Sequence, residues 1–171
     1  MPELSVTRTL QECVNEVLEK MFFIDCSGEQ GGELSPEAGI TVRLEFEGDP
    51  PGVLFLRVTA EAARDVAGGF LGIDDKDLSE PQIGAVVCEL ANMICGSVLS
   101  RIESSATFRL GAPHIVSSES DSGEPGRRVQ GAVPDPAACS AAYAAMVGEG
   151  RLVVRLDLEK PAWNASARSA F

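Results

Sequence analysis

The sequence predicts a single α+β domain in which helices pack against a mostly antiparallel sheet. Long helical patterns and two strand hairpins follow one another, without the regular alternation of strand, helix and strand that builds a parallel sheet. The chain has 171 residues, of which 44% are hydrophobic. This length and composition are enough for one hydrophobic core, so we expect one domain over residues 1–171.

The first helix is expected to begin near Thr9, because apolar residues at 10, 14, 17, 18 and 21 recur at helical spacing. Thr9 and Glu12 are spaced as a capping box at its start. A short strand is expected over 22–25. The glycine-rich stretch 27–32 follows it and indicates a loop.

The next predicted unit is a hairpin. Residues 40–46 alternate apolar and polar side chains, which is typical of a strand with one solvent-exposed face. A turn rich in Gly and Pro connects them to the apolar stretch 53–59, so these two strands should pair antiparallel. A shorter helix over 61–71 comes next, and its two adjacent glycines, Gly68 and Gly69, predict fraying.

The longest predicted helix runs from Ser79 to about Glu103. Ser79 and Gln82 are spaced as a capping box, and Pro81 suits the first helical turn. Its core face is a stripe of apolar residues at positions 83, 86, 87, 90, 94, 98 and 102. A strand over 107–116 follows, and its interruption at Pro113 places it at a sheet edge or a bulge.

The last third of the chain contains one segment without any readable pattern. Residues 117–136 are rich in Ser, Gly, Pro and charge, which predicts a mobile loop. Residues 140–147 and 151–158 flank a glycine-containing turn and predict a closing hairpin. The tail over 162–171 is expected to be frayed.

Charge and composition limit the partners. A net charge of −12 repels the phosphates of nucleic acid and anionic lipid surfaces, so we expect neither nucleic acid binding nor membrane insertion. Apolar runs are shorter than the roughly 20 residues that span a bilayer, and the N-terminus does not resemble a leader, which predicts a cytoplasmic protein. Five scattered cysteines indicate buried thiols, and a single histidine, His114, argues against a metal site of nitrogen and sulfur ligands.

The long helix has an unusual face opposite its core stripe. Between Glu80 and Arg101 the only charged residue is Glu89, whereas an exposed helix face normally carries several. Asn92 stands one turn from Glu89, among small or apolar residues. We interpret this face as a docking surface; its other predicted contact residues are Ala85, Cys88, Gly96 and Leu99. Burial of the helix on both sides, as at a dimer interface, is the alternative.

A weaker echo of this pattern occurs on the first helix. Glu12 and Asn15 have the same spacing as Glu89 and Asn92, which suggests a possible internal duplication and a possible second site. However, several charged residues surround this first pair, and no glycine follows it. An ordinary solvated face is therefore favoured there.

The segment from Cys88 to Gly96, followed by Gly111-Ala112-Pro113, resembles the signature helix and following strand of the CheX-type chemotaxis phosphatases, relatives of CheC and FliY. This resemblance implies a CheC/CheX-like fold and a phosphatase acting on the aspartyl phosphate of a phosphorylated CheY-like receiver domain. It implies that Asn92 orients the attacking water and that Glu89 binds the conserved lysine of the receiver. It further implies no cofactor of its own, Mg²⁺ on the receiver, and a homodimer.

The residue types suit that chemistry. An asparagine amide offers a donor and an acceptor without charge, so Asn92 can hold a water without repelling phosphoryl oxygens. The sequence departs from the CheC-type motif at Ala85, where that branch has Asp or Ser. Two alternatives remain open: a non-catalytic receiver-docking or flagellar-switch adaptor of the same fold, and a homodimerising interaction domain.

Overall fold

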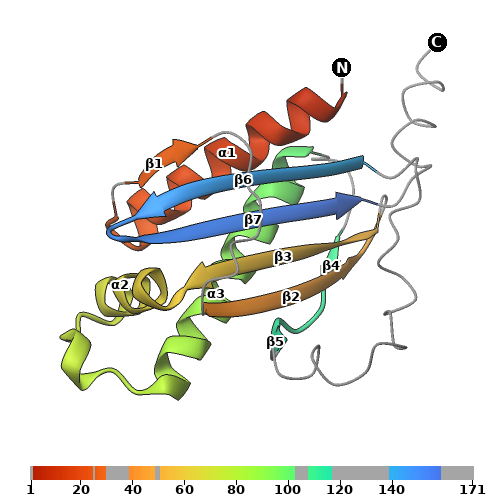
Figure 1. Ribbon diagram of the computed structural model, residues 1–171. Coiled ribbons are helices and arrows are strands. Elements are labelled where there is room, and N and C mark those ends of the chain that lie inside the picture. Colours follow the sequence, from red (N-terminus) through yellow and green to blue (C-terminus); the bar gives the residue numbers. More distant parts are fainter. Residues whose placement is uncertain are drawn as a thin grey trace, which may run out of the picture.

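In the computed structural model, the described residues form three α-helices that cover one face of a seven-stranded sheet (Figure 1). The structure describes residues 2–24, 26–29, 39–48, 51–102, 108–116 and 139–158. The predicted loop over 117–136 and the predicted tail over 162–171 lie outside these residues. The elements are α1 (Pro2–Met21), β1 (Cys26–Glu29), β2 (Gly39–Glu47), β3 (Gly52–Thr59), α2 (Ala60–Leu71), the 3-10 turn η1 (Asp75–Asp77), α3 (Glu80–Ile102), β4 (Arg109–Leu110), β5 (His114–Val116), β6 (Cys139–Val147) and β7 (Gly150–Leu158).

The sheet has the order β1-β6-β7-β3-β2-β4, with β5 also paired to β2, and every pairing is antiparallel. Both predicted hairpins, β2–β3 and β6–β7, are confirmed. They join into one sheet through β3 and β7, where Leu54 pairs with Leu156 and Leu56 with Val154. The predicted α+β fold with a mostly antiparallel sheet is therefore confirmed.

Strands β4 and β5 form a broken edge strand along β2. Phe46 of β2 pairs with Leu110, and Val42 pairs with Ile115. The break falls at residues 111–113, where the amide of Gly111 still donates to the carbonyl of Glu45 at 2.8 Å. The break confirms the predicted interruption at the edge of the sheet. It includes Pro113, which has no N–H to donate to a neighbouring strand.

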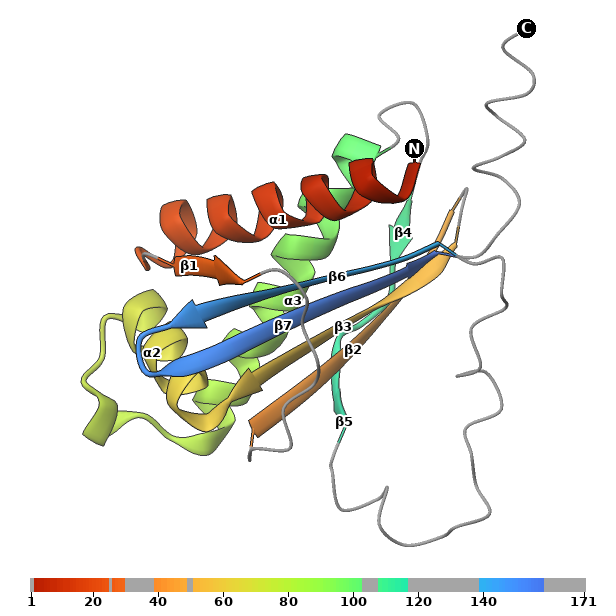
Figure 2. The ribbon, with the colours of Figure 1, turned by 45° about the horizontal axis from the view of Figure 1, so that its top comes forward.

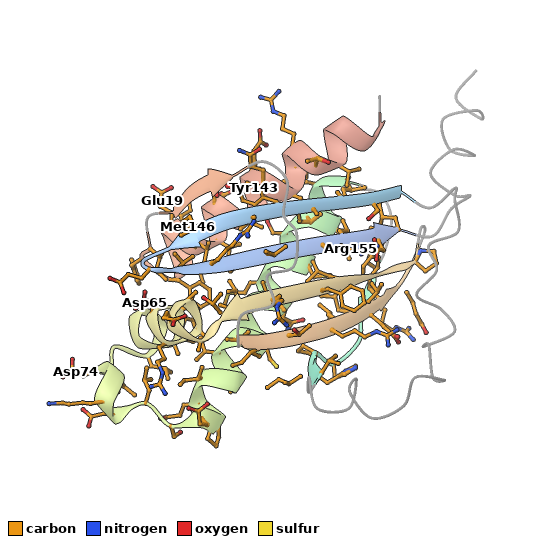
Figure 3. The ribbon with its side chains drawn as sticks, in the orientation of Figure 1. Glu19, Asp65, Asp74, Tyr143, Met146 and Arg155 are labelled. Carbon is orange, nitrogen blue, oxygen red and sulfur yellow. The ribbon has the colours of Figure 1, made fainter. Side chains whose placement is uncertain are left out.

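The hydrophobic core lies between the helices and the sheet. Alternate residues of the strands point toward the helices and are fully buried, as Leu44, Leu56 and Val154 show. The opposite face of the sheet carries arginines instead, among them Arg43 and Arg155, and Figure 3 shows Arg155 on β7. No described helix covers this second face (Figure 2).

The region after the first helix differs from the prediction. Helix α1 begins at Pro2 rather than near Thr9, and the first strand is 26–29 rather than 22–25. Residues 22–24 instead wrap around the helix end, where the amide of Ile24 donates to the carbonyl of Leu18 at 3.0 Å. Their apolar pattern reflects burial of Phe22 at the helix terminus, which a strand pattern resembles over so short a stretch.

Helix α2 also differs, because it does not fray at its glycine pair. The helix continues to Leu71 and ends at Gly72, which has a left-handed φ of 67° and donates its N–H to the carbonyl of Gly68 at 2.9 Å. A Cβ at Gly69 would come within 2.9 Å of the carbonyl oxygen of Phe22. The glycine pair thus permits close packing of α2 on the end of α1.

Helix α3 begins and ends where predicted. The amide of Ser79 donates to Gln82 Oε1 at 2.9 Å, and the amide of Gln82 donates to Ser79 Oγ at 3.3 Å, which confirms the capping box. Contrary to the expectation from the sequence, this helix is long and apolar enough to span a bilayer by composition, the one such helix among the described residues. Its most apolar stretch is 56% buried within the domain, as is typical of a core helix.

Candidate functional site

Helix α3 presents one side to the core and the other to solvent, as its apolar stripe predicts. Val87, Leu90 and Ile94 are fully buried against the rest of the domain. On the opposite side, Glu89 is exposed and Asn92 is half-buried. The alternative that α3 is buried on both sides within one chain is therefore excluded for the described residues.

The two polar side chains of this face have no partner within the described part of the chain. No hydrogen bond or ion pair joins the carboxylate of Glu89 or the amide of Asn92 to another described residue. Elsewhere on the helix layer, ion pairs join neighbouring helices: Arg64 contacts Glu80 at 3.2 Å, and Arg101 contacts Glu16. A carboxylate and an amide one turn apart are thus available to an external group.

Small residues surround this pair. Ala85 is exposed, and Cys88 and Gly96 are half-buried, so all three lie at the predicted surface. A Cβ at Gly96 would meet nothing within 4 Å, whereas one at Gly84 would lie 2.9 Å from the side chain of Ile115. Packing among the described residues therefore does not require a glycine at position 96. The open space leaves the backbone of α3 accessible to close approach from outside.

The structure contradicts the predicted role of Leu99 as a contact residue. Leu99 was expected on the docking surface, but only 2% of it is exposed and it belongs to the hydrophobic core. Leu99 lies near the C-terminal end of α3, where α1 packs against this helix and Glu16 contacts Arg101. The exposed stretch of the face ends before this turn, so Leu99 is not available to a partner. We define the docking face as Ala85, Cys88, Glu89, Asn92 and Gly96.

The second Glu-x-x-Asn pair, Glu12 and Asn15 on α1, makes contacts within the domain. The hydroxyl of Tyr143, a residue that is only 2% exposed, donates to Asn15 Oδ1 at 2.9 Å. Figure 3 shows Tyr143 on β6, beside α1. Glu12 forms an exposed ion pair with Arg8 at 3.0 Å. Glu12 thus lies on a solvated face, as expected, whereas Asn15 is half-buried and accepts a hydrogen bond from a buried tyrosine. Tyr143 could not be identified as a partner from local sequence.

The described thiols are poor nucleophiles. Burial raises the pKa of Cys13 and of Cys88, and it raises the pKa of Cys95 to about 12. The thiolate is the reactive form of cysteine. At neutral pH these groups are protonated, so the chemistry of the docking face rests on the carboxylate and the amide.

The chain is similar to a family of known proteins. Residues 40–132, more than half of the chain, match the model of the family described as chemotaxis phosphatase CheX. No curated protein matches the sequence. The matched segment contains the whole docking face.

Solved structures of CheX and FliY proteins have the same fold. A chemotaxis protein CheX from Desulfovibrio desulfuricans is 17% identical, with a TM-score of 0.65 over 91% of this chain and 99% of that one. CheX in a CheX-CheY-BeF3-Mg complex from Borrelia burgdorferi is 16% identical, with a TM-score of 0.64 over 90% and 97%. FliY from Thermotoga maritima is 15% identical, with a TM-score of 0.56 over 89% and 85%.

Proposed function

This chain belongs to the CheX family of chemotaxis phosphatases, and we propose on that basis that it accelerates hydrolysis of the aspartyl phosphate of a CheY-like receiver domain. One observation carries the proposal: Glu89 and Asn92 stand one turn apart on an open helix face, without partners among the described residues. The Borrelia CheX relative was crystallised with CheY, beryllofluoride and magnesium, which supports a receiver as the partner.

Asn92 is the residue that we assign to the attacking water. Phosphoryl transfer has a loose transition state, so the helper protein contributes mainly by position and needs no strong base. The amide can accept a hydrogen bond from the water with its oxygen and donate one to a phosphoryl oxygen with its nitrogen. The water oxygen then bonds to phosphorus as the bond to the aspartyl oxygen breaks. The water proton leaves with the phosphate, and the aspartate carboxylate is regenerated.

Glu89 is assigned to recognition of the receiver. Its carboxylate is exposed, and the other residues of the docking face are uncharged. A cationic group of the partner, which the family resemblance identifies as the conserved receiver lysine, would form a charge-assisted hydrogen bond with it. The Mg²⁺ of the reaction belongs to the receiver in this proposal, and this chain contributes no cofactor. Such a partner also fits the predicted cytoplasmic location.

We also propose that the chain forms a homodimer through the edge of its sheet. Strand β5 lies at the edge of the sheet, and Ile115 and Val116 are 49% and 40% exposed there. An exposed apolar edge strand is a template for pairing with a second chain. A dimer that pairs through β5 would leave the docking face on α3 open to a receiver.

Phosphate release from CheY-like receivers of the same organism tests the proposed function. Each receiver is phosphorylated with a small phosphodonor, the donor is removed, and inorganic phosphate is followed with and without substoichiometric wild-type protein. We expect faster release with multiple turnovers for at least one receiver. Binding of a receiver without any acceleration would instead indicate an adaptor. Neither binding nor acceleration, together with a dimer seam on α3, would indicate the homodimerising domain.

A further inference from the structure

Within the described part of the chain, six large hydrophobic residues are exposed, and four of them lie at one end of the helix layer. Met21 is the last residue of α1, Phe23 lies two residues beyond it, and Phe70 and Leu71 end α2; they are 48%, 81%, 38% and 38% exposed. The rings of Phe22 and Phe70 stack with their centroids 4.9 Å apart, which joins the two helix ends. We call Met21, Phe23, Phe70 and Leu71 the end patch.

Phe23 combines two unfavourable features. Its φ is 57°, the left-handed region that disfavours any residue with a Cβ, and it is the only described residue other than glycine with a positive φ. Phe23 is also the most exposed large apolar residue among those that the structure describes. Glycine is the usual residue in this conformation at a helix end. A strained backbone that displays an aromatic ring to solvent suggests a functional constraint.

The geometry of the end patch is fixed by the fold. The amide of Ile24 donates to the carbonyl of Leu18, which holds the turn that contains Phe23. The absence of a side chain at Gly69 lets α2 approach the carbonyl of Phe22 closely. Because the backbone of this turn is held in place, an apolar side chain on it loses less conformational freedom on binding than one on a mobile segment, which suits an interface anchor.

The docking face is too small to bind a protein by itself. A specific interface of standard size uses roughly 20–30 residues on each side, and one face of α3 supplies far fewer. A receiver that contacts Glu89 must therefore cover neighbouring elements too. Helices α1, α2 and α3 lie in one layer (Figure 2), and Arg64 of α2 contacts Glu80 of α3. Among the residues described in α1, α2 and the turns beside them, the end patch is the exposed group of large apolar side chains.

We propose that the end patch is a second contact for the phosphorylated receiver domain and that Phe23 is its central anchor. The inference rests on the proposed function, because it extends the same interface. The partner surface must be apolar and must adjoin the pocket of the aspartyl phosphate. The docking face then governs the reaction, and the end patch governs affinity.

Phe23→Gly provides the sharpest test. Glycine is favoured at a φ of 57°, so this variant keeps the fold while it removes the ring. We expect the Kd for a beryllofluoride-loaded receiver to rise about tenfold or more, as for loss of an interface anchor. The maximal rate of phosphate release at saturating receiver should stay at the wild-type value. A second variant, Leu71→Glu, should raise the Kd in the same way.

Phe55→Ala is the control, because it removes a half-buried aromatic ring from the opposite face of the sheet, away from the helix layer and from β5. An unchanged Kd for both Phe23→Gly and Leu71→Glu would overturn the inference. A weaker homodimer with unchanged receiver affinity would overturn it as well and assign the patch to a second copy. Binding to the beryllofluoride form requires no catalysis, so receiver binding without acceleration refutes the proposed function alone. Wild-type protein that binds no receiver refutes both.

Discussion

Asn92→Ala is expected to abolish the acceleration of phosphate loss from the receiver. The amide is the one group of the docking face that can hold the attacking water and contact the phosphoryl oxygens together. Loss of a positioning group or of a transition-state donor typically lowers a rate about 100-fold or more. The side chain has no partner among the described residues, so the free energy of unfolding should change by less than about 0.5 kcal/mol. Single-turnover phosphate release, with thermal unfolding in parallel, measures both quantities.

The first helix supplies a matched control for this substitution. Asn15→Ala removes the asparagine of the other Glu-x-x-Asn pair and leaves the hydroxyl of Tyr143 without this acceptor. We expect it to lower the free energy of unfolding by about 1–3 kcal/mol and to leave the maximal rate per folded molecule unchanged. If Asn92→Ala retained the wild-type rate, or if Asn15→Ala lost it, the assignment of the reaction to α3 would be wrong.

Gly96→Leu is expected to have the second-largest effect. It should keep or raise the stability of the domain and weaken its binding to the receiver. A glycine inside a helix costs about 1 kcal/mol relative to alanine, and a Cβ at this position meets nothing within 4 Å. Substitution should therefore leave the domain equally stable or more stable. If a receiver approaches the backbone of α3 here, the added side chain should weaken binding by about 1–3 kcal/mol, or roughly five- to 150-fold in Kd.

A graded series makes this result specific. Gly96→Ala should weaken receiver binding less than Gly96→Leu, because steric conflict increases with size. Ala60→Leu introduces a leucine at an exposed position of α2 and should leave the Kd unchanged. Equal affinities for wild-type protein and Gly96→Leu would mean that no partner approaches α3 at this turn.

Local patterns in the sequence predicted the elements that position the site. The apolar stripe of α3 and the Ser79–Gln82 capping box specify a helix over nearly the observed range. Because the stripe is buried, the face that carries Glu89 and Asn92 must point outward, and it does. The two hairpins were also predictable, since period-two alternation and glycine-containing turns are local signals.

Contacts between distant segments were not predictable in this way. The pairing of β3 with β7 joins residues about 100 positions apart, and no local sequence pattern indicates which strands will pair. The burial of Leu99 depends on α1, which packs against the C-terminal end of α3, and a helical wheel does not show such a neighbour. The hydrogen bond from Tyr143 to Asn15 likewise depends on where β6 meets α1. The end patch arises only because Phe22 and Phe70 bring two helix ends together.

A crystal structure of this protein with its receiver, Mg²⁺ and beryllofluoride tests the central claim most directly. We expect α3 to lie over the phosphorylation pocket. The amide of Asn92 should be within hydrogen-bond distance of the beryllofluoride or of a water in line with it, and the carboxylate of Glu89 should contact the receiver lysine. A complex in which the receiver binds elsewhere, with Glu89 and Asn92 still facing solvent, would contradict the account.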